Sequence, residues 1–313
     1  PSAPGELADG WDSHPHDVSR LQTADRSRRP RRMRATLLLS IVGALFLQPS
    51  LSADESLKVM TYNLRYASNS KPNAWPDRLP HMADIIRKTN PDIIGTQEGK
   101  FYQLKELNAK IPGYTWFGTG RDGGSRGEFM AIFYKPERFE ILEYDHFWLS
   151  DTPNVIASTT WGHSNRRMVT WIRFLDRKTK KQFYFWNTHF DHRVQPAREK
   201  AALLVNKKVA ALKTSLPVIL VGDFNASAGL NAAYDTLTED GGFTDTLLSA
   251  AKSINADWNT MNGFRPTKKG TRRIDWVLAK GPVKTSEAVI VLYDNSKQYP
   301  SDHQPVTAVI TLE

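Results

Sequence analysis

The stretch PVILVGDFN, residues 217–225, holds the two features that decide the fold of this chain. Its first half is a short apolar run of β-branched and aliphatic residues, which is typical of a buried strand. Its second half places Asp223 and Asn225 directly after that strand. A single Asp or Asn at a strand end usually bonds its own backbone in a turn, so this stretch alone predicts a strand and no function.

Similar apolar runs recur on both sides of this stretch. The predicted strands are residues 57–62, 92–95, 130–134, 169–175, 182–186, 217–221, 274–278, 288–292 and 305–310. Apolar residues recur with helical spacing at residues 78–88, 102–109 and 197–212. Many strands interleaved with few helices favour an α+β fold of two packed sheets with helices outside, over a barrel in which a helix follows every strand.

Polar side chains of a few types flank six of the predicted strands. In chain order they are Asn63, Glu98, Asn187 with His189, Asp223 with Asn225, Asp275, and Asp302 with His303. Each of these residues also has a purely structural explanation. Glu98 could be the acidic residue in the first turn of the following helix, where it favours the helix dipole, and His189 could be a histidine in the core. The formation of turns does not by itself require a carboxylate, an amide or an imidazole at so many strand ends. We therefore expect these side chains to converge in one cluster of carboxylates, amides and imidazoles.

Composition narrows the chemistry that such a cluster can perform. The 313 residues include no cysteine, which excludes disulfides, thiol nucleophiles and cysteine-ligated metal centres. The formal net charge of +9 fits an anionic partner such as nucleic acid, a phosphorylated metabolite or a phospholipid surface. Charge alone does not distinguish among these partners.

The first 53 residues have the pattern of a disordered leader followed by a signal peptide. Residues 1–32 show no apolar periodicity, and Arg31, Arg32 and Arg34 then precede an apolar run from Leu37 to Leu47. Small residues at 50–53 complete a signal peptide of about residues 33–53. The eleven-residue run reaches about half of the ~30 Å hydrocarbon core, so a permanent span is the weaker interpretation. We expect a secreted or periplasmic protein with one domain at residues 54–313.

Taken together, the motifs resemble the endonuclease/exonuclease/phosphatase superfamily. The resemblance covers residues 57–312 and is carried by Asn63 in Thr-Tyr-Asn-Leu-Arg, Glu98 in Gly-Thr-Gln-Glu, Asn187-Thr-His189, Gly222-Asp-Phe-Asn225, Ile274-Asp275 and Ser301-Asp302-His303. It implies a DNase I-like, four-layer αββα sandwich of two packed mixed sheets flanked by helices. It also implies hydrolysis of a phosphoester with a divalent metal.

The resemblance suggests a role for each motif residue. Mg²⁺ or Mn²⁺ prefers hard oxygen ligands, so the metal ligands are expected at Glu98, with Asn63 beside it and Asp302 as a third. Asp223 would orient or deprotonate the attacking water, and Asn225 would donate to the transition state. His189 and His303 would hold phosphate oxygens or exchange protons. Asp275 would orient one of these histidines. Whether Asp223 or His303 is the base stays open.

Further residues match a secreted, deadenylase-like branch that includes nocturnin. Arg78, Arg121, Arg167 and His192 are the predicted substrate-binding residues, with Glu128 and Asp191 near them. An arginine just before a strand can clamp a phosphate with two hydrogen bonds. A solvated surface arginine with nothing to bind is the alternative for each of them.

The motifs predict the reaction and leave the substrate open. We expect a monomeric, exported, metal-dependent phosphodiesterase or phosphatase acting on nucleic acid or on a small phosphorylated molecule. One alternative is a phospholipid or sphingomyelin phosphodiesterase, although no long apolar insertion for membrane contact is present. A second is a secreted binding module that kept the fold and lost catalysis.

Overall fold

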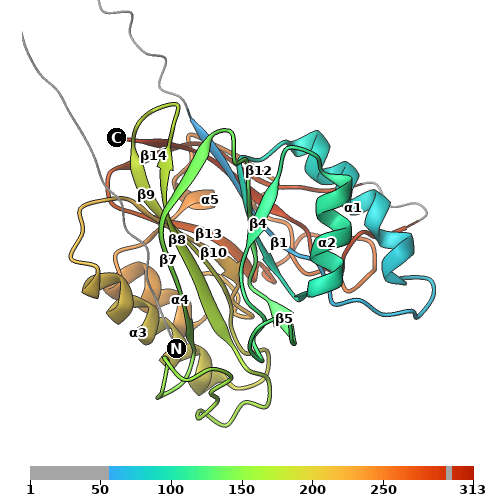
Figure 1. The fold of residues 1–313 in the computed structure, drawn as a ribbon, viewed down its shortest axis with the longest axis horizontal. Helices are drawn as coiled ribbons and strands as arrows, with labels where there is room; N and C mark the ends of the chain where they lie inside the picture. The colour runs from blue at the N-terminus through green and yellow to red at the C-terminus, as the bar shows by residue number, and fades with distance from the viewer. Residues whose placement is uncertain (1–55, 294–297) are drawn as a thin grey trace, which may run out of the picture. The chain divides into compact units, whose positions relative to one another are not determined.

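The structure, a computed structural model, describes residues 56–293 and 298–313 (Figure 1). The leader and signal peptide predicted for residues 1–53 lie outside this part of the chain. None of the helices within it has both the length and the apolar character that crossing a membrane requires.

The first sheet has seven strands in the order β12-β14-β15-β1-β2-β6-β4. Their bounds are β1 Leu57–Asn63, β2 Ile93–Gln97, β4 Thr115–Phe117, β6 Ile132–Tyr134, β12 Lys252–Ile254, β14 Val283–Ile290 and β15 Val306–Leu312. Strands β1 and β2 run parallel, so Asn63 pairs in register with Gln97 at their carboxyl ends. Glu98 is the next residue along the chain, which places it beside Asn63 at the same edge of the sheet.

The second sheet has six strands in the order β11-β13-β10-β9-β8-β7. Their bounds are β7 Phe139–Trp148, β8 Met168–Asp176, β9 Gln182–His189, β10 Val218–Asp223, β11 Thr244–Asp245 and β13 Asp275–Lys280. A separate two-stranded ribbon pairs β3, Gly99–Lys100, with β5, Glu128–Phe129. Strand β10 runs parallel to β9 and antiparallel to β13.

Helices cover the outer face of each sheet, which completes four layers. Buried side chains of α1, Trp75–Thr89, and α2, Phe101–Lys110, pack on the first sheet. Those of α3, Gln195–Ala211, pack on the second, beside the short α4, Ala232–Asp235, and the π-helix η1, Thr236–Asp240. Figure 1 shows α1 and α2 on one side and α3 on the other, with α5, Thr246–Ser249, near the strands. The αββα sandwich predicted from the sequence is confirmed.

The two sheets pack face to face on a core of aliphatic and phenylalanine side chains. They approach closely where Gly95 of β2 faces Val221 of β10. A Cβ atom at Gly95 would lie 2.3 Å from Val221 Cγ2 and 2.9 Å from Asn187 Cγ, so glycine is required for this approach. Because Gly95 and Val221 each lie two residues before a strand end, this contact also sets the spacing of the site residues.

Several elements differ from the sequence predictions. Strand β7 was not predicted, because three acidic residues interrupt its apolar pattern and it lies at the edge of its sheet with its middle exposed. Helix α1 begins at Trp75 rather than Arg78, since proline is well tolerated in a first helical turn and Pro76 lies there. Strand β14 spans Val283–Ile290, whereas the sequence predicted a strand at residues 288–292. The residues before 288 are partly exposed and largely polar, so this half of the strand lacks the apolar pattern of a buried strand.

Candidate active site

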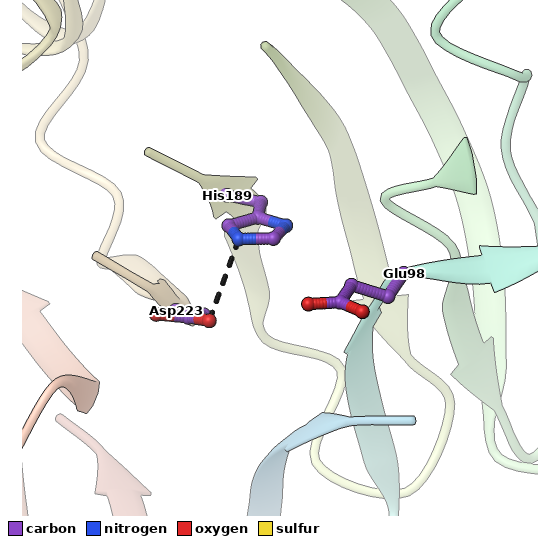
Figure 2. Close-up of side chains that lie close together, drawn as sticks. All are labelled: Glu98, His189 and Asp223. Atoms are coloured by element: carbon purple, nitrogen blue, oxygen red, sulfur yellow. Dashed lines mark ion pairs between the residues drawn. The ribbon is translucent and has the colours of Figure 1, made fainter. Parts of the chain in front are cut away.

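Three neighbouring strands of the second sheet bring three of the predicted site residues into line. The register pairs Asp223, at the end of β10, with His189 at the end of β9 and with Asp275 at the start of β13. His189 Nε2 lies 3.4 Å from Asp223 Oδ2. Figure 2 shows both side chains with Glu98, whose carboxylate points toward them from the residue after β2. Strand pairing alone therefore assembles the middle of the site.

Asp275 forms a buried pair with His303, which lies shortly before β15. His303 Nδ1 and Asp275 Oδ2 are 2.9 Å apart. Burial alone would lower the pKa of His303, but the charges of Asp275 and Asp223 outweigh it and raise the pKa well above its usual value. His303 is therefore an imidazolium near neutral pH. Its Nε2 lies 3.8 Å from Asp223 Oδ2, so the positive charge faces the centre of the site.

Asp223 is the buried carboxylate at that centre. Burial raises the pKa of Asp223 to about 7, and the nearby charge of Asp275 adds to the effect. Its Oδ1 accepts a hydrogen bond from the backbone N–H of Asn225 at 2.9 Å, and its Oδ2 accepts one from Asn63 Nδ2 at 2.9 Å. A carboxylate whose pKa lies near neutrality is suited to accept a proton from water.

Asn225 and His189 form the next contact along this edge. Asn225 Nδ2 donates to the carbonyl oxygen of Phe190 at 3.1 Å and lies 3.0 Å from His189 Nε2. Burial lowers the pKa of His189 well below its usual value, and the positive charges of Arg167 and Arg121 lower it further. His189 is therefore neutral. Since Nε2 accepts from the amide, the proton lies on Nδ1, which has no hydrogen-bond partner among the described residues.

The opposite side of the site is an acidic wall made of Glu98 and Asp302. Arg65 lies between the two carboxylates, with Nη1 3.8 Å from Glu98 Oε2 and Nε 3.6 Å from Asp302 Oδ2. Burial raises the pKa of Asp302. Burial also disfavours the charge of Glu98, but Arg65 and His303 outweigh this effect and lower its pKa. Asp302 Oδ1 is buried and has no hydrogen-bond partner in the described part of the chain.

These residues fit a divalent cation. Glu98, His189 and Asp223 each offer a ligand atom within 4.8 Å of the others, and Asp302 adds an unpartnered buried oxygen. Carboxylate oxygens are the ligands that Mg²⁺ and Mn²⁺ prefer. The closeness of His189 and Asp223 to Glu98 depends on how the two sheets pack, so the sequence could not show it.

Asn63 is placed differently from its prediction as a metal ligand. Its Oδ1 accepts the backbone N–H of Arg65 at 2.8 Å. Its Nδ2 donates to Glu98 Oε1 at 3.1 Å and to Asp223 Oδ2 at 2.9 Å. In this structure Asn63 thus holds the two carboxylates at a fixed separation and presents a donor to them, so it acts as a positioning residue.

A basic wall of Arg121, Arg167 and His192 faces the same cavity. Arg121 makes two contacts with Glu128, Nη1 to Oε2 at 2.7 Å and Nη2 to Oε1 at 3.1 Å. Arg167 is 3% exposed, and its Nη2 lies 3.1 Å from His192 Nδ1. Its Nε and Nη1 are buried and have no hydrogen-bond acceptor among the described residues, although Asp191 Oδ2 lies 3.6 Å from Nε.

Arg78, the fourth predicted substrate-binding residue, does not reach the cavity. Its guanidinium is fully buried and donates to the backbone carbonyls of five residues, Asn73, Leu64, Pro300, Arg65 and Tyr66, at 2.8–3.4 Å. The prediction is wrong because these donors are already used to join the loop after β1 to the loop before β15. Sequence could not show this, since Pro300 lies 222 positions away.

The walls enclose a cavity of about 280 Å³, close to the lower limit for small-molecule sites. The sequence analysis missed four of its lining residues, Arg65, Tyr66, Asn165 and Met261. Arg65 is the last residue of the quoted Asn63 motif and Tyr66 follows it directly, and this position was the one available signal. Asn165 and Met261 lie in loops outside any quoted motif.

The sequence matches the model of the Endonuclease/Exonuclease/phosphatase family over residues 60–303. This match includes every strand end that contributes to the cavity.

Three relatives illustrate the range of similarity. A mannosyl-6-phosphatase of Bacteroides thetaiotaomicron is 34% identical with a TM-score of 0.77, over 82% of this chain and 99% of that one. The human nocturnin catalytic domain is 18% identical with a TM-score of 0.64, over 82% and 95% of the two chains, and shares the fold. The uncharacterized protein L388 of Acanthamoeba polyphaga mimivirus is 30% identical over 175 residues, 52% of this chain. The match spans 63% of that relative, less than two thirds of its length.

Proposed function

The chain belongs to the endonuclease/exonuclease/phosphatase family, and we propose that it is a phosphoesterase that hydrolyses a small phosphate ester with Mg²⁺ or Mn²⁺ after export from the cytoplasm. The observation that supports this most directly is the row of His189, Asp223 and Asp275 facing the acidic wall. Together with His303, which pairs with Asp275, that arrangement combines a proton acceptor, a positive charge and a group of hard oxygen ligands in one cavity.

Asp223 and His303 have different roles in the proposed reaction. The Asp223 carboxylate accepts a proton from water, whose oxygen forms a new bond to phosphorus while the ester P–O bond breaks. The charges of Asp275 and Asp223 raise the pKa of His303 well above its usual value, which favours the imidazolium over the proton-accepting form. The imidazolium instead balances the negative charge that develops on the phosphoryl oxygens. The leaving oxygen takes a proton from solvent, which gives an alcohol and a phosphate.

Glu98 and Asp302 would hold the divalent cation, which leaves Asp223 available for water. When bound, such a cation supplies positive charge to the phosphate and to the leaving oxygen. Arg65 lies 3.6–3.8 Å from both carboxylates, so these ion pairs include no close hydrogen bond. A cation that binds Glu98 and Asp302 would therefore have only these weak ion pairs to displace. Asn63 keeps Glu98 within reach of Asp223.

One observation favours a small substrate over a polymer. The 34% identical protein of Bacteroides thetaiotaomicron is a mannosyl-6-phosphatase. A phosphorylated sugar or a similarly sized phosphate ester is therefore the proposed substrate class. Preferential hydrolysis of a phospholipid or a nucleic acid would contradict this substrate class.

The function is tested by release of nitrophenol from p-nitrophenyl phosphate and its diester analogues with Mg²⁺, Mn²⁺ or EDTA. We expect turnover with metal, its loss in EDTA and its recovery when metal is added back. Glu98→Gln should lower the metal-dependent rate about 100-fold or more while the far-ultraviolet circular dichroism stays unchanged. A folded protein that is inert with every divalent metal would instead support the binding module.

The export proposal rests on the arginines, the apolar run and the small residues that precede residue 54. Expression of the full chain followed by fractionation and N-terminal sequencing tests it. Export predicts a product outside the cytoplasm that begins near residue 54. An uncleaved product confined to the cytoplasm would contradict it.

A further inference from the structure

Thr260, in the loop between β12 and β13, joins the two chain segments that carry Asp275 and His303. These two residues are 28 positions apart in the sequence. The backbone N–H of Thr260 donates to the carbonyl oxygen of Arg272 at 3.0 Å. Its carbonyl oxygen accepts the N–H of Gln304, the residue after His303, at 2.6 Å. Thr260 thus contacts the backbone on both sides of the buried pair.

The Thr260 hydroxyl is fully buried and uses every hydrogen-bonding position that it has. Oγ1 accepts the backbone N–H of Ile274 at 2.9 Å and that of Asp275 at 3.1 Å. Its own proton points to the carbonyl oxygen of Arg272, at 3.4 Å. One donor and two acceptor positions are all that a hydroxyl offers. The hydroxyl therefore fixes the chain at the point where Asp275 begins β13.

The direction of the Asp275 carboxylate depends on this stretch of backbone. Asp275 is fully buried, and the hydrogen-bond partner of its carboxylate in the described part of the chain is His303 Nδ1, 2.9 Å from Oδ2. A shift of the Asp275 backbone would therefore move His303, whose Nε2 lies 3.8 Å from Asp223 Oδ2. A misplacement of about 1 Å near the reacting atoms can lower a rate about 100-fold.

We propose that Thr260 is a positioning residue of the active site, whose hydroxyl holds the Asp275 backbone so that its carboxylate keeps His303 in place. This inference rests on the proposed function. Thr260 is fully buried and does not line the cavity, so it touches no substrate. Its loss should therefore change turnover rather than substrate binding.

The kinetic test uses p-nitrophenyl phosphate or methyl p-nitrophenyl phosphate, whichever the wild-type protein hydrolyses faster with Mg²⁺ or Mn²⁺. Thr260→Val replaces the hydroxyl by a methyl group, and should lower kcat about 10- to 100-fold while KM changes less than about twofold. Thr260→Ser keeps the hydroxyl and should hold kcat within about threefold of the wild-type value.

Thr246→Val is the matched control. Thr246 is also buried, and its hydroxyl donates to the carbonyl oxygen of Val277, farther along β13, at 2.7 Å. This variant also loses a buried hydrogen bond and should lower the urea midpoint. Its kcat should change less than about twofold, which separates a loss of stability from a loss of position.

Nitrogen-15 NMR of protein labelled at its histidine rings gives a readout that does not need turnover. The signals of His303 are identified by their loss in His303→Asn, and the Nδ1 shift reports its hydrogen bond to Asp275. In metal-free protein this shift should change in Thr260→Val and stay at its wild-type value in Thr260→Ser and Thr246→Val. An unchanged shift in Thr260→Val would overturn the positioning role.

The two proposals fail in different ways. If the wild-type protein hydrolyses neither ester with Mg²⁺ or Mn²⁺, the proposed function fails and the catalytic part of this inference with it. If an ester is hydrolysed but Thr260→Val retains kcat, or Thr246→Val loses as much, only the positioning role is overturned. Should Thr260→Val not fold, Thr260→Cys decides, because its thiol is a weaker acceptor than the serine hydroxyl and should give a lower kcat than Thr260→Ser.

Discussion

Replacing Arg78 by methionine should destabilise the protein without removing any contact to substrate. Methionine retains much of the apolar stem and removes the guanidinium, whose hydrogen bonds to the carbonyls of Leu64 and Pro300, both at 2.8 Å, are buried. The remaining carbonyl contacts are only partly buried, so water can replace them.

The magnitude follows from these contacts. Two buried carbonyls that lose their donor cost about 1–3 kcal/mol each, and relief from burying a charge returns part of that cost. Burial indeed lowers the pKa of Arg78, which shows that its charge is disfavoured there. We expect a net loss of about 3 kcal/mol, or a fall in Tm of about 6–12 °C for a domain of this size.

Urea unfolding, followed by tryptophan fluorescence, measures this loss of stability. The urea concentration at the midpoint should fall, while the dependence of the unfolding free energy on urea concentration stays the same. Arg87→Met is the matched control on the same helix, because Arg87 is about half exposed and should cost less than about 1 kcal/mol. Turnover should also fall, since Leu64 follows Asn63 and Pro300 precedes the 301–303 turn. Wild-type stability of Arg78→Met with a raised KM would refute this reasoning and restore Arg78 as a substrate-binding residue.

Three further results are expected. Glu98→Gln should lower kcat about 100-fold or more and raise the metal concentration needed for half-maximal activity, and near-normal metal dependence would contradict its role. The raised pKa leaves Asp223 protonated below about pH 7, where it cannot accept a proton from water. At saturating metal, kcat/KM should therefore be constant above that pH and fall as the pH decreases below it. A kcat/KM that rises as the pH decreases would exclude Asp223 as the base. Gly95→Ala should cost about 1–3 kcal/mol by urea unfolding, since the new methyl would overlap Val221, and an unchanged midpoint would show that the sheets can separate at no cost.

Much of the site could be predicted because its residues follow strands with local signals. The run at 218–221 predicted β10, and Asp223 and Asn225 occupy the end of that strand as expected. The same argument located His189 at the end of β9, whereas Asp275 was located as the residue that leads into β13. Strand β7 escaped because an edge strand with acidic residues lacks the apolar pattern of a buried strand.

The sequence by itself therefore determined the two-sheet architecture, the positions of the polar strand ends and the absence of thiol chemistry. Only the tertiary structure decided that Asp275 pairs with His303, that Asn63 holds two carboxylates, and that Arg167 faces a cavity while Arg78 is buried in a loop junction. The physical reason is that strand patterns are local, whereas burial and ion pairing depend on partners many positions away. Two arginines that were both predicted to bind substrate thus acquire different roles from the atoms that surround them.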